Sequence, residues 1–250
     1  TALSYAVIHG NFNSAERLIQ MGADVIVDGH INILNNLNGR LYQPDMHKFK
    51  GNIIYDVVNL GNNDMLELFL SSDPSLVRLP GLLQIAVCCL NLEVVKTLLK
   101  YKVDVNAPDL NGCTALYHLC GINKEALSSV AKEILKELLV EGADVNIAAL
   151  TTGGYPIHNA CINLDKEFVD MLIGAGAKLD VTNKSGMLPM YAAFLSGNLE
   201  VILHLAKNYH VPVEEEYFNV LLNSPIVDES KLDKSELIGL IEYELALIEN

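Results

Sequence analysis

The stretch LLVEGADVN, from Leu138 to Asn146, recurs along the chain and decides how the rest of it is interpreted. Near copies are LIQMGADV at 18–25, LLKYKVDVN at 98–106 and LIGAGAKLD at 172–180. Each copy joins a pair of aliphatic residues to a polar turn and a short extended tail. Recurrence at a roughly fixed interval is typical of repeat architectures, so this stretch sets the register for the whole chain.

Short helical patterns surround each of these turns. In the segment 1–11, Leu3, Ala6 and Val7 share one helical face, and Gly10 with Asn11 ends the helix. A second helix then runs to Gly22, and two short helices joined by such a turn form an antiparallel pair. The same pattern recurs in the segments 52–70, 82–106, 114–146, 155–180 and 188–211.

These units resemble ankyrin repeats, whose opening reads T-P-L-H-x-A and whose length is about 33 residues. The matching openings are TALSYA at 1–6, NIIYDV at 52–57, TALYHL at 114–119, YPIHNA at 155–160 and LPMYAA at 188–193. The histidine of the family opening survives only as His158, where the resemblance implies a structural bond to backbone near a finger loop, the turn between successive helix pairs. Elsewhere we expect the finger loops to be held differently.

The predicted fold is an all-α ankyrin-repeat solenoid of about six helix-turn-helix units with finger loops. An insertion at 26–50 contains Asp28-Gly29 between β-rich runs, which predicts a β-hairpin. The helix-favouring segment 123–134 predicts a longer second helix or a larger turn in the fourth unit. Residues 214–250 are expected to form a degenerate terminal unit with a C-terminal capping helix. The units themselves are expected near residues 1–25, 51–76, 80–107, 109–147, 150–181 and 183–213.

Composition excludes several functions. The formal charge of −14 disfavours nucleic-acid binding, which needs clustered Lys and Arg. No apolar run approaches the roughly 20 residues of a membrane span. The five cysteines lack paired C-x-x-C spacing, which indicates free thiols in a reducing, cytoplasmic compartment. The first residue is Thr1, so we expect a piece of a longer chain.

Catalytic and metal chemistry are not expected from the sequence. The pairs His158 with Cys161 and His118 with Cys120 would need a base within hydrogen-bond reach of the thiol and a third group to orient it. Aligned to the family, both cysteines instead occupy one buried scaffold position. Only His30 and His47 stand out as residues that could converge on a metal ion. We therefore predict no catalytic residue, no metal, no cofactor and no small-molecule substrate.

The resemblance to ankyrin repeats implies partner contacts on the finger loops and on the exposed side of each first helix. The expected loop contacts are Asp109, Leu110, Asn111, Cys113, Thr151, Thr152, Asn183, Lys184 and Met187. The expected helix contacts are Ile8, His9, Leu60, Cys89, Ile122, Ile162, Asn163 and Leu195.

Most of these positions are neutral or apolar, and an apolar strip with a polar rim marks an interaction site when it is contiguous. The alternative is that neighbouring finger loops or the insertion cover some of them. The insertion adds Arg40, Tyr42 and Lys48 as candidate contacts, since long loops on compact scaffolds are often functional. The alternative is that the insertion is a solvent-exposed loop that caps the edge of the first unit.

The predicted function is therefore a non-catalytic protein–protein interaction module. The alternative is a targeting domain of a larger bacterial effector or enzyme, because the irregular repeats resemble ankyrin effectors that intracellular bacteria deliver into host cells; the partner would then be a host protein. Asn106 and Asn146 also resemble the sites that asparaginyl hydroxylases modify in this family. Their structural interpretation, an asparagine that bonds finger-loop backbone, holds either way.

Overall fold

The computed structural model describes residues 1–25, 52–122 and 129–214, together with 216, 217, 219, 238, 239, 241–243 and 246. Within these ranges the chain consists of helices and turns, without a β-strand. The predicted all-α fold is confirmed. The hairpin expected at 26–50 lies outside the described residues. Among the described helices, none has the length and apolar character that crossing a membrane requires.

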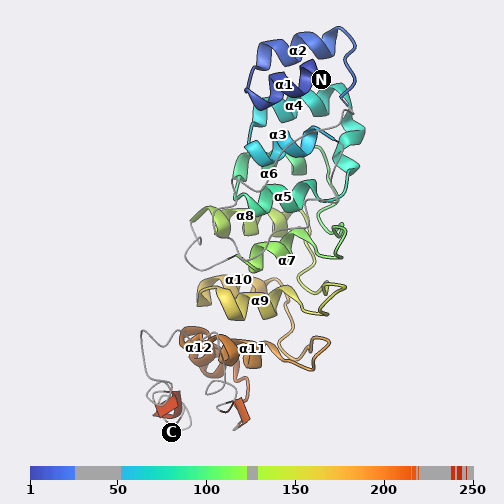
Figure 1. Cartoon of the computed structure of the whole chain (residues 1–250). Helices are drawn as coiled ribbons and strands as arrows, with labels where there is room; N and C mark the ends of the chain where they lie inside the picture. The colour runs from blue at the N-terminus through green and yellow to red at the C-terminus, as the bar shows by residue number, and fades with distance from the viewer. Residues whose placement is uncertain are drawn as a thin grey trace. The chain divides into compact units, whose positions relative to one another are not determined.

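The helices follow one another as antiparallel pairs (Figure 1). The described residues contain six such pairs, which confirms the predicted helix-turn-helix units. A short 3-10 helix, η3 (Pro74–Arg78), follows the second pair. The pairs are α1 (Ala2–Ile8) with α2 (Phe12–Gln20), α3 (Ile54–Leu60) with α4 (Asn63–Ser72), α5 (Leu82–Cys88) with α6 (Leu92–Lys100), α7 (Ala115–Cys120) with α8 (Ser129–Val140), α9 (Pro156–Asn163) with α10 (Lys166–Gly174), and α11 (Pro189–Ser196) with α12 (Leu199–Tyr209).

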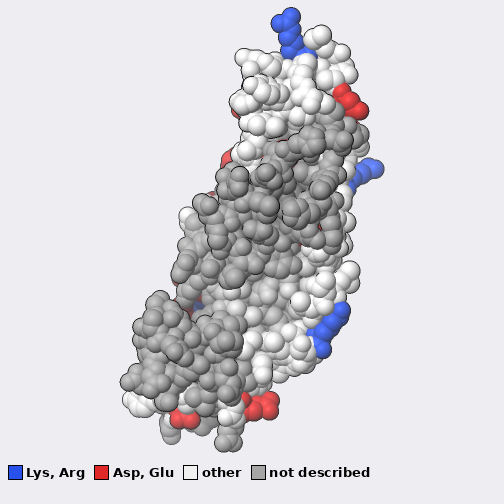
Figure 2. All heavy atoms as spheres, viewed as in Figure 1, with Lys and Arg blue, Asp and Glu red and all other residues white. Residues whose placement is uncertain are grey.

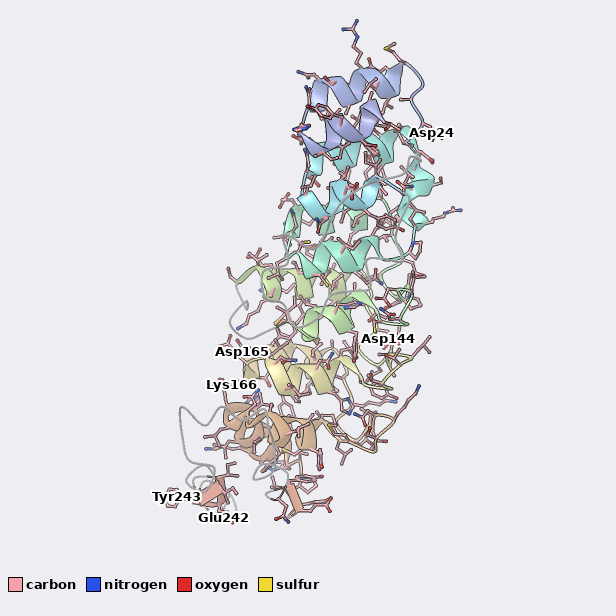
Figure 3. All side chains as sticks on the ribbon, in the orientation of Figure 1. Asp24, Asp144, Asp165, Lys166, Glu242 and Tyr243 are labelled. Atoms are coloured by element: carbon pink, nitrogen blue, oxygen red, sulfur yellow. The ribbon has the colours of Figure 1, made fainter. Side chains whose placement is uncertain are left out.

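The second helix of most pairs begins at a side chain that caps its backbone. Asn11, Asn62 and Asn91 each accept a hydrogen bond from the N–H three residues later. Asp165 does the same for α10 and lies at its start (Figure 3). Such caps satisfy a backbone donor that the helix leaves free, and each stabilises the helix by about 1 kcal/mol. The repeated Gly-Asn turn in the sequence is thus both the end of one helix and the start of the next.

The chain divides into two compact units by its internal contacts. Unit 1 comprises 1–119 with 127–144, and unit 2 comprises 120–126 with 145–250. In unit 1, first helices α1, α3 and α5 contact one another in succession, as do second helices α2, α4, α6 and α8. In unit 2, α9 packs on α11 and α10 packs on α12. Like helices therefore stack on like helices within each unit, as expected for a solenoid.

Large apolar side chains fill the space between the helices. Phe69 of α4, Phe168 of α10 and Phe194 of α11 are fully buried. Each such side chain contributes about 1.5–3 kcal/mol by leaving water. Tyr217 is 3% exposed and packs with its ring centroid 5.6 Å from that of Phe194. A residue after the sixth pair thus covers part of α11, which is the role expected of a terminal cap.

Two asparagines bridge successive finger loops through both ends of their side-chain amides. Asn106 Nδ2 donates to Gly142 O at 3.0 Å, and its Oδ1 accepts from Asp144 N at 2.8 Å. Asn146 makes the same pair of bonds to Gly176 O and Lys178 N, at 2.9 and 3.1 Å. The structural interpretation of these residues is confirmed. The recurring stretch LLVEGADVN therefore ends on a residue that joins one repeat to the next.

The fourth repeat departs from the others in its second helix. Helix α8 has 12 residues, compared with nine in each of α2, α6 and α10. This agrees with the predicted longer second helix in that unit. Residues 123–128, which contain the rest of the predicted helical segment, lie outside the described residues.

Candidate protein-binding surface

The first helices of the repeats carry almost no charge. Across α1, α3, α5, α7, α9 and α11, the only Asp, Glu, Lys or Arg is Asp56, which is 3% exposed. Every described second helix carries at least one Asp or Glu. On the side of the molecule seen in Figure 2, the described surface is mostly uncharged, with isolated basic and acidic side chains. Exposed side chains of the first helices therefore offer an uncharged surface.

In unit 1, six expected contact residues are exposed or half-buried, and we call them the unit 1 face: Ile8, His9, Leu60, Cys89, Leu110 and Asn111. Ile8, Leu60 and Leu110 expose 45%, 43% and 51% of their surface. His9 is exposed, and its ring lies 4.1 Å from that of Tyr5. Because α1, α3 and α5 contact one another in succession, the helical members of this face lie on adjacent elements.

In unit 2, the exposed expected residues lie in the finger loops. Thr151, Thr152 and Lys184 are exposed, and Lys184 N donates to Thr152 O at 3.0 Å, which joins two successive loops. Ile122 is buried in this unit, and the other expected contacts are half-buried, namely Ile162, Asn163, Asn183, Met187 and Leu195. Asn183 shapes its own loop, since its Oδ1 accepts from Ser185 N and Met187 N.

One exposed loop residue was missed from the sequence. Leu150 is 71% exposed, and it follows the first residue of its finger turn as Leu110 follows Asp109. The turn 149–154 is closed by Ala149 N donating to Gly154 O, and the turn 109–113 by Asp109 N donating to Cys113 O. The turn 149–154 is one residue longer than the turn 109–113, so equivalent positions in the two loops are offset in the sequence. An alignment of the loops on their first residue matches Leu150 with Leu110.

Three expected contact residues are buried and need correction. Asp109 is 6% exposed, Cys113 is 0% exposed and Ile122 is 7% exposed. The backbone of the finger loop turns the Asp109 and Cys113 side chains inward, so a docking partner would meet Leu110 and Asn111 instead. The insertion residues Arg40, Tyr42 and Lys48, and the possible metal ligands His30 and His47, lie outside the described residues.

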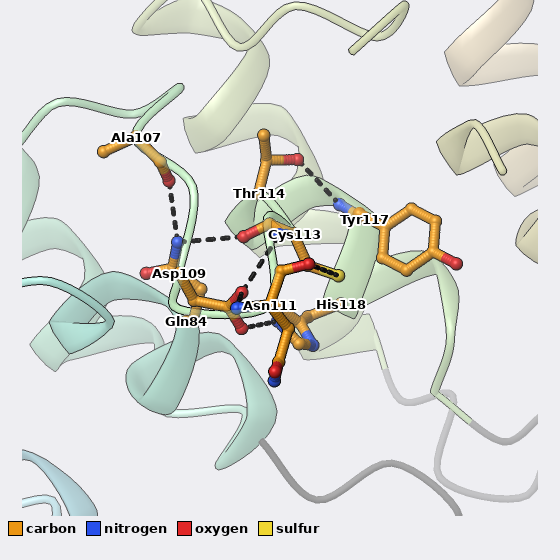
Figure 4. A network of polar contacts seen from close by, with 8 residues as sticks. All are labelled: Gln84, Ala107, Asp109, Asn111, Cys113, Thr114, Tyr117 and His118. Atoms are coloured by element: carbon orange, nitrogen blue, oxygen red, sulfur yellow. Dashed lines mark hydrogen bonds and ion pairs between the residues drawn. The ribbon is translucent and has the colours of Figure 1, made fainter. Parts of the chain in front are cut away.

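Asp109 organises a buried polar network in the finger loop before α7 (Figure 4). Its Oδ1 accepts from Asn111 N at 2.8 Å and from Cys113 N at 3.0 Å, and its Oδ2 accepts from His118 Nε2 at 2.8 Å. Burial by itself would raise the pKa of the Asp109 carboxyl, but the His118 and backbone hydrogen bonds outweigh it and hold that pKa below its usual value. The sequence analysis did not predict that Asp109, Cys113 and His118 lie together, because His118 is closer in the sequence to Cys120 and was considered with that residue.

The residue at the family's histidine position does the same job in three repeats with three different side chains. Tyr55 Oη donates to Pro80 O at 3.0 Å, Gln84 Nε2 to Ala107 O at 2.8 Å, and His158 Nε2 to Met187 O at 2.8 Å. Each acceptor is a backbone carbonyl near the opening of the next repeat. The expectation that these loops are held differently is therefore wrong for Tyr55 and Gln84: the side chain differs, and the bond is retained.

The two Cys–His pairs show no nucleophile–base arrangement. Both ring nitrogens of His158 bond backbone, Nδ1 to Tyr155 N at 3.2 Å and Nε2 to Met187 O, and burial lowers the pKa of this imidazole. Burial raises the pKa of the Cys161 thiol to about 12 and that of Cys120 further. Thiols with such pKa values stay protonated near neutral pH and are poor nucleophiles. The scaffold interpretation of both cysteines agrees with this.

Comparison with known proteins finds ankyrin repeats in part of the chain. A family model described as ankyrin repeats (3 copies) matches residues 124–215. The putative ankyrin repeat protein L371 of Acanthamoeba polyphaga mimivirus is 28% identical over 127 residues, which is 51% of this chain and 16% of the viral protein. The ankyrin repeat protein OPG189 of variola virus is 29% identical over 126 residues, which is 50% of this chain and 21% of that protein.

Two further matches extend over more of the chain. The human transient receptor potential cation channel subfamily A member 1 is 26% identical over 204 residues, covering 77% of this chain and 17% of the channel. Among solved structures, the ankyrin repeat domain of Bcl-3, titled a unique member of the IkappaB protein family, superposes with a TM-score of 0.62 at 20% identity, covering 82% of this chain and 85% of that domain. The chain thus spans about a sixth to a fifth of the length of the two viral proteins and the channel. The family model thus identifies ankyrin repeats in residues 124–215, and the helix pairs share the fold of a solved ankyrin repeat domain.

Proposed function

We propose that this chain binds a protein partner without catalysing a reaction, and that its contacts come from the unit 1 face and from the unit 2 finger-loop residues Leu150, Thr151, Thr152 and Lys184. The observation that carries the proposal is the separation of charge between the two helices of each repeat. First helices expose apolar and neutral side chains, while second helices hold the acids. Interface cores are depleted in charged residues, so the first-helix side is the better docking surface.

The chemistry of this surface favours an uncharged partner segment. Ile8, Leu60 and Leu110 are the large apolar side chains of the unit 1 face, and none of its members is Asp, Glu, Lys or Arg. A partner that presented a charged side chain to this face would have to desolvate it without an opposite charge, which is unfavourable. Nucleic acid is a poor fit for the same reason, since a chain of net charge −14 lacks the basic surface that phosphates need.

The test is to introduce charge into the unit 1 face and follow partner binding. Leu60→Glu and Leu110→Glu alter side chains that are 43% and 51% exposed, so both variants are expected to fold with little change in melting temperature. A photo-crosslinking amino acid at Leu60 or Leu110 should capture the partner covalently. The same group at Gln20, an exposed position on second helix α2, should not capture it.

The variants then decide the location of the site. If the partner is captured at Leu60, Leu60→Glu should weaken its binding at least tenfold, and the matched variant Gln20→Glu should leave it unchanged. Binding that survives both Leu60→Glu and Leu110→Glu in folded protein would place the site elsewhere and contradict the proposal.

A second candidate function is that of a targeting segment within a larger protein. The supporting observation is that the relatives match this chain over only a small part of their length, including 17% of a human cation channel. The complete open reading frame tests it: an adjoining catalytic or membrane domain supports targeting, and a reading frame of repeats alone opposes it. The three relatives named above are two viral proteins and a human channel, and none of them is bacterial. The expected bacterial effector origin therefore stays a prediction.

A further inference from the structure

Three side chains of metal-binding type converge in the finger loop that precedes α7. Asp109, Cys113 and His118 each present one ligand atom, and these atoms lie within 4.8 Å of one another. The loop supplies Asp109 and Cys113, and helix α7 supplies His118 (Figure 4). All three residues are buried, at 6%, 0% and 1% exposure. The spacing is D-x3-C-x4-H, and the turn from the finger loop into α7 brings the three side chains together.

The surrounding backbone orients these groups. Two N–H groups hold Oδ1 of Asp109, which leaves Oδ2 as the oxygen directed at His118. Gln84 of α5 donates to both Ala107 O and Cys113 O, at 2.8 and 3.3 Å, and so fixes the loop that carries the thiol. Hydrogen bonds of this kind, which hold ligands in place from outside the metal's own contacts, tune most protein metal sites.

We propose that Asp109, Cys113 and His118 bind one Zn²⁺ ion. Carboxylate oxygen, thiolate sulfur and imidazole nitrogen are the three ligand types that Zn²⁺ takes in proteins, and a water molecule would complete four-coordinate geometry. Calcium and magnesium require oxygen ligands and do not suit this set. The charges also balance, because one carboxylate, one thiolate and a neutral imidazole cancel the two positive charges of the ion at a buried location.

Binding requires a defined rearrangement of protons. The Cys113 thiol releases its proton to solvent and becomes a thiolate. The imidazole releases its Nε2 proton to solvent and carries its one remaining proton on Nδ1, which leaves Nε2 able to bind the metal. The hydrogen bond of 2.8 Å between Nε2 and Asp109 Oδ2 is then replaced by two bonds to the ion. Metal affinity therefore falls as pH decreases. Without metal, Asp109 and His118 are joined by their hydrogen bond where the ion would lie. The test must therefore distinguish the metal-free site from the metal-bound site.

Cobalt is the probe, because Co²⁺ occupies zinc sites and absorbs visible light. The reduced chain, freed of metal with a chelator, is titrated with Co²⁺. We expect one equivalent to produce a thiolate-to-metal charge-transfer band and the intense visible bands of tetrahedral Co²⁺. Zn²⁺ should then displace Co²⁺ and raise the melting temperature. Absence of the charge-transfer band in folded protein overturns the proposal.

Matched cysteine variants identify the ligand. Cys113→Ser should weaken Co²⁺ binding by more than about 100-fold, beyond the 10–100-fold that loss of an outer hydrogen bond causes. Cys89→Ser, which changes the half-buried cysteine of α5's C-terminus, should leave the spectrum and affinity unchanged. A band that survives Cys113→Ser or disappears in Cys89→Ser contradicts the assignment.

A measurement on the unmodified chain covers the case in which Cys113→Ser does not fold. X-ray absorption at the zinc edge should find one sulfur at about 2.3 Å and nitrogen or oxygen ligands at about 2.0–2.2 Å. A shell without sulfur, or with more than one, contradicts the three-residue site.

Discussion

Many buried polar side chains of the described residues are hydrogen-bonded, but one carboxylate oxygen of Asp56 is not. Gln84 and His158 bond backbone carbonyls, and Asp109 bonds His118. Asp56 lies on α3 at 3% exposure, and among the described residues its Oδ2 has no hydrogen-bond partner. Burial raises the pKa of this carboxyl to about 7. A single residue therefore makes stability depend on pH near neutrality.

Replacement of Asp56 by valine should stabilise the protein most above neutral pH. The folded pKa of about 7 exceeds the ordinary value of 3.8, so the native state holds its proton more tightly than the unfolded chain. The contribution of Asp56 is fully favourable below pH 3.8 and is lost as pH rises toward 7, and the loss is at most about 4 kcal/mol. Asp56→Val removes this loss, and urea unfolding at pH 5 and pH 8 measures it. The exposed change Asp180→Asn is the control, and an Asp56→Val gain that is equal at both pH values would contradict the raised pKa.

At the scale of elements, most helix pairs end in a turn whose backbone has a positive φ. Gly22, Gly142 and Gly176 occupy this position with φ of 85°, 87° and 93°. The third repeat has Lys102 there, at φ 61°. Side chains with a Cβ atom disfavour this region by roughly 1 kcal/mol or more, so the third repeat carries local strain that the repeats with glycine at this position avoid.

Substitutions of Gly142 and Lys102, which occupy equivalent turn positions, should therefore have opposite effects on the stability of the fold. Gly142→Ala should destabilise the chain by about 1 kcal/mol through backbone strain alone, because a Cβ there meets no atom within 4 Å. Lys102→Gly should stabilise it by up to about 1 kcal/mol. Its ion pair with Glu141, at 3.3 Å and largely exposed, offsets little of this. Lys102→Ala, which removes the pair and keeps the strain, is the control, and thermal unfolding that ranks Lys102→Ala above Lys102→Gly would refute the strain at this turn.

At the scale of the whole molecule, charge and apolar surface are separated by the repeat itself. Acids recur on second helices, and the described ion pairs between successive second helices, such as Lys100 with Glu67 at 2.8 Å, lie at the surface. Exposed pairs of this kind contribute about 0–1 kcal/mol each. The net charge of −14 acts on the entire chain, so repulsion is the larger electrostatic effect.

Added salt should consequently raise the melting temperature. Between about 0.01 M and 0.15 M ionic strength the screening length falls from roughly 30 to 8 Å, which removes long-range repulsion and weakens the short surface pairs less. Differential scanning calorimetry in sodium chloride and in potassium chloride should give the same rise. A melting temperature that falls with salt would mean that the surface pairs dominate.

Much of the fold follows from the sequence because its causes are local. The Gly-Asn turn, the capping asparagines and the aliphatic pairs act within a few residues, and they recur in register from Leu18 to Asp180. That recurrence is enough to predict six helix pairs, the structural role of Asn106, and the uncharged side of the first helices. The burial of Asp109 and Cys113 does not follow from it, since their loop positions in the sequence look like those of Leu110 and Asn111.

The sequence by itself thus determined the repeat and its phase. The tertiary structure alone decided which loop side chains face solvent and which turn inward. Asp109 turns inward because the backbone of its own loop and His118 of α7 bond its carboxylate, and Gln84, 29 residues before Cys113, holds the loop in that conformation. Such contacts join residues far apart in the chain, so the periodicity of a repeat carries no information about them.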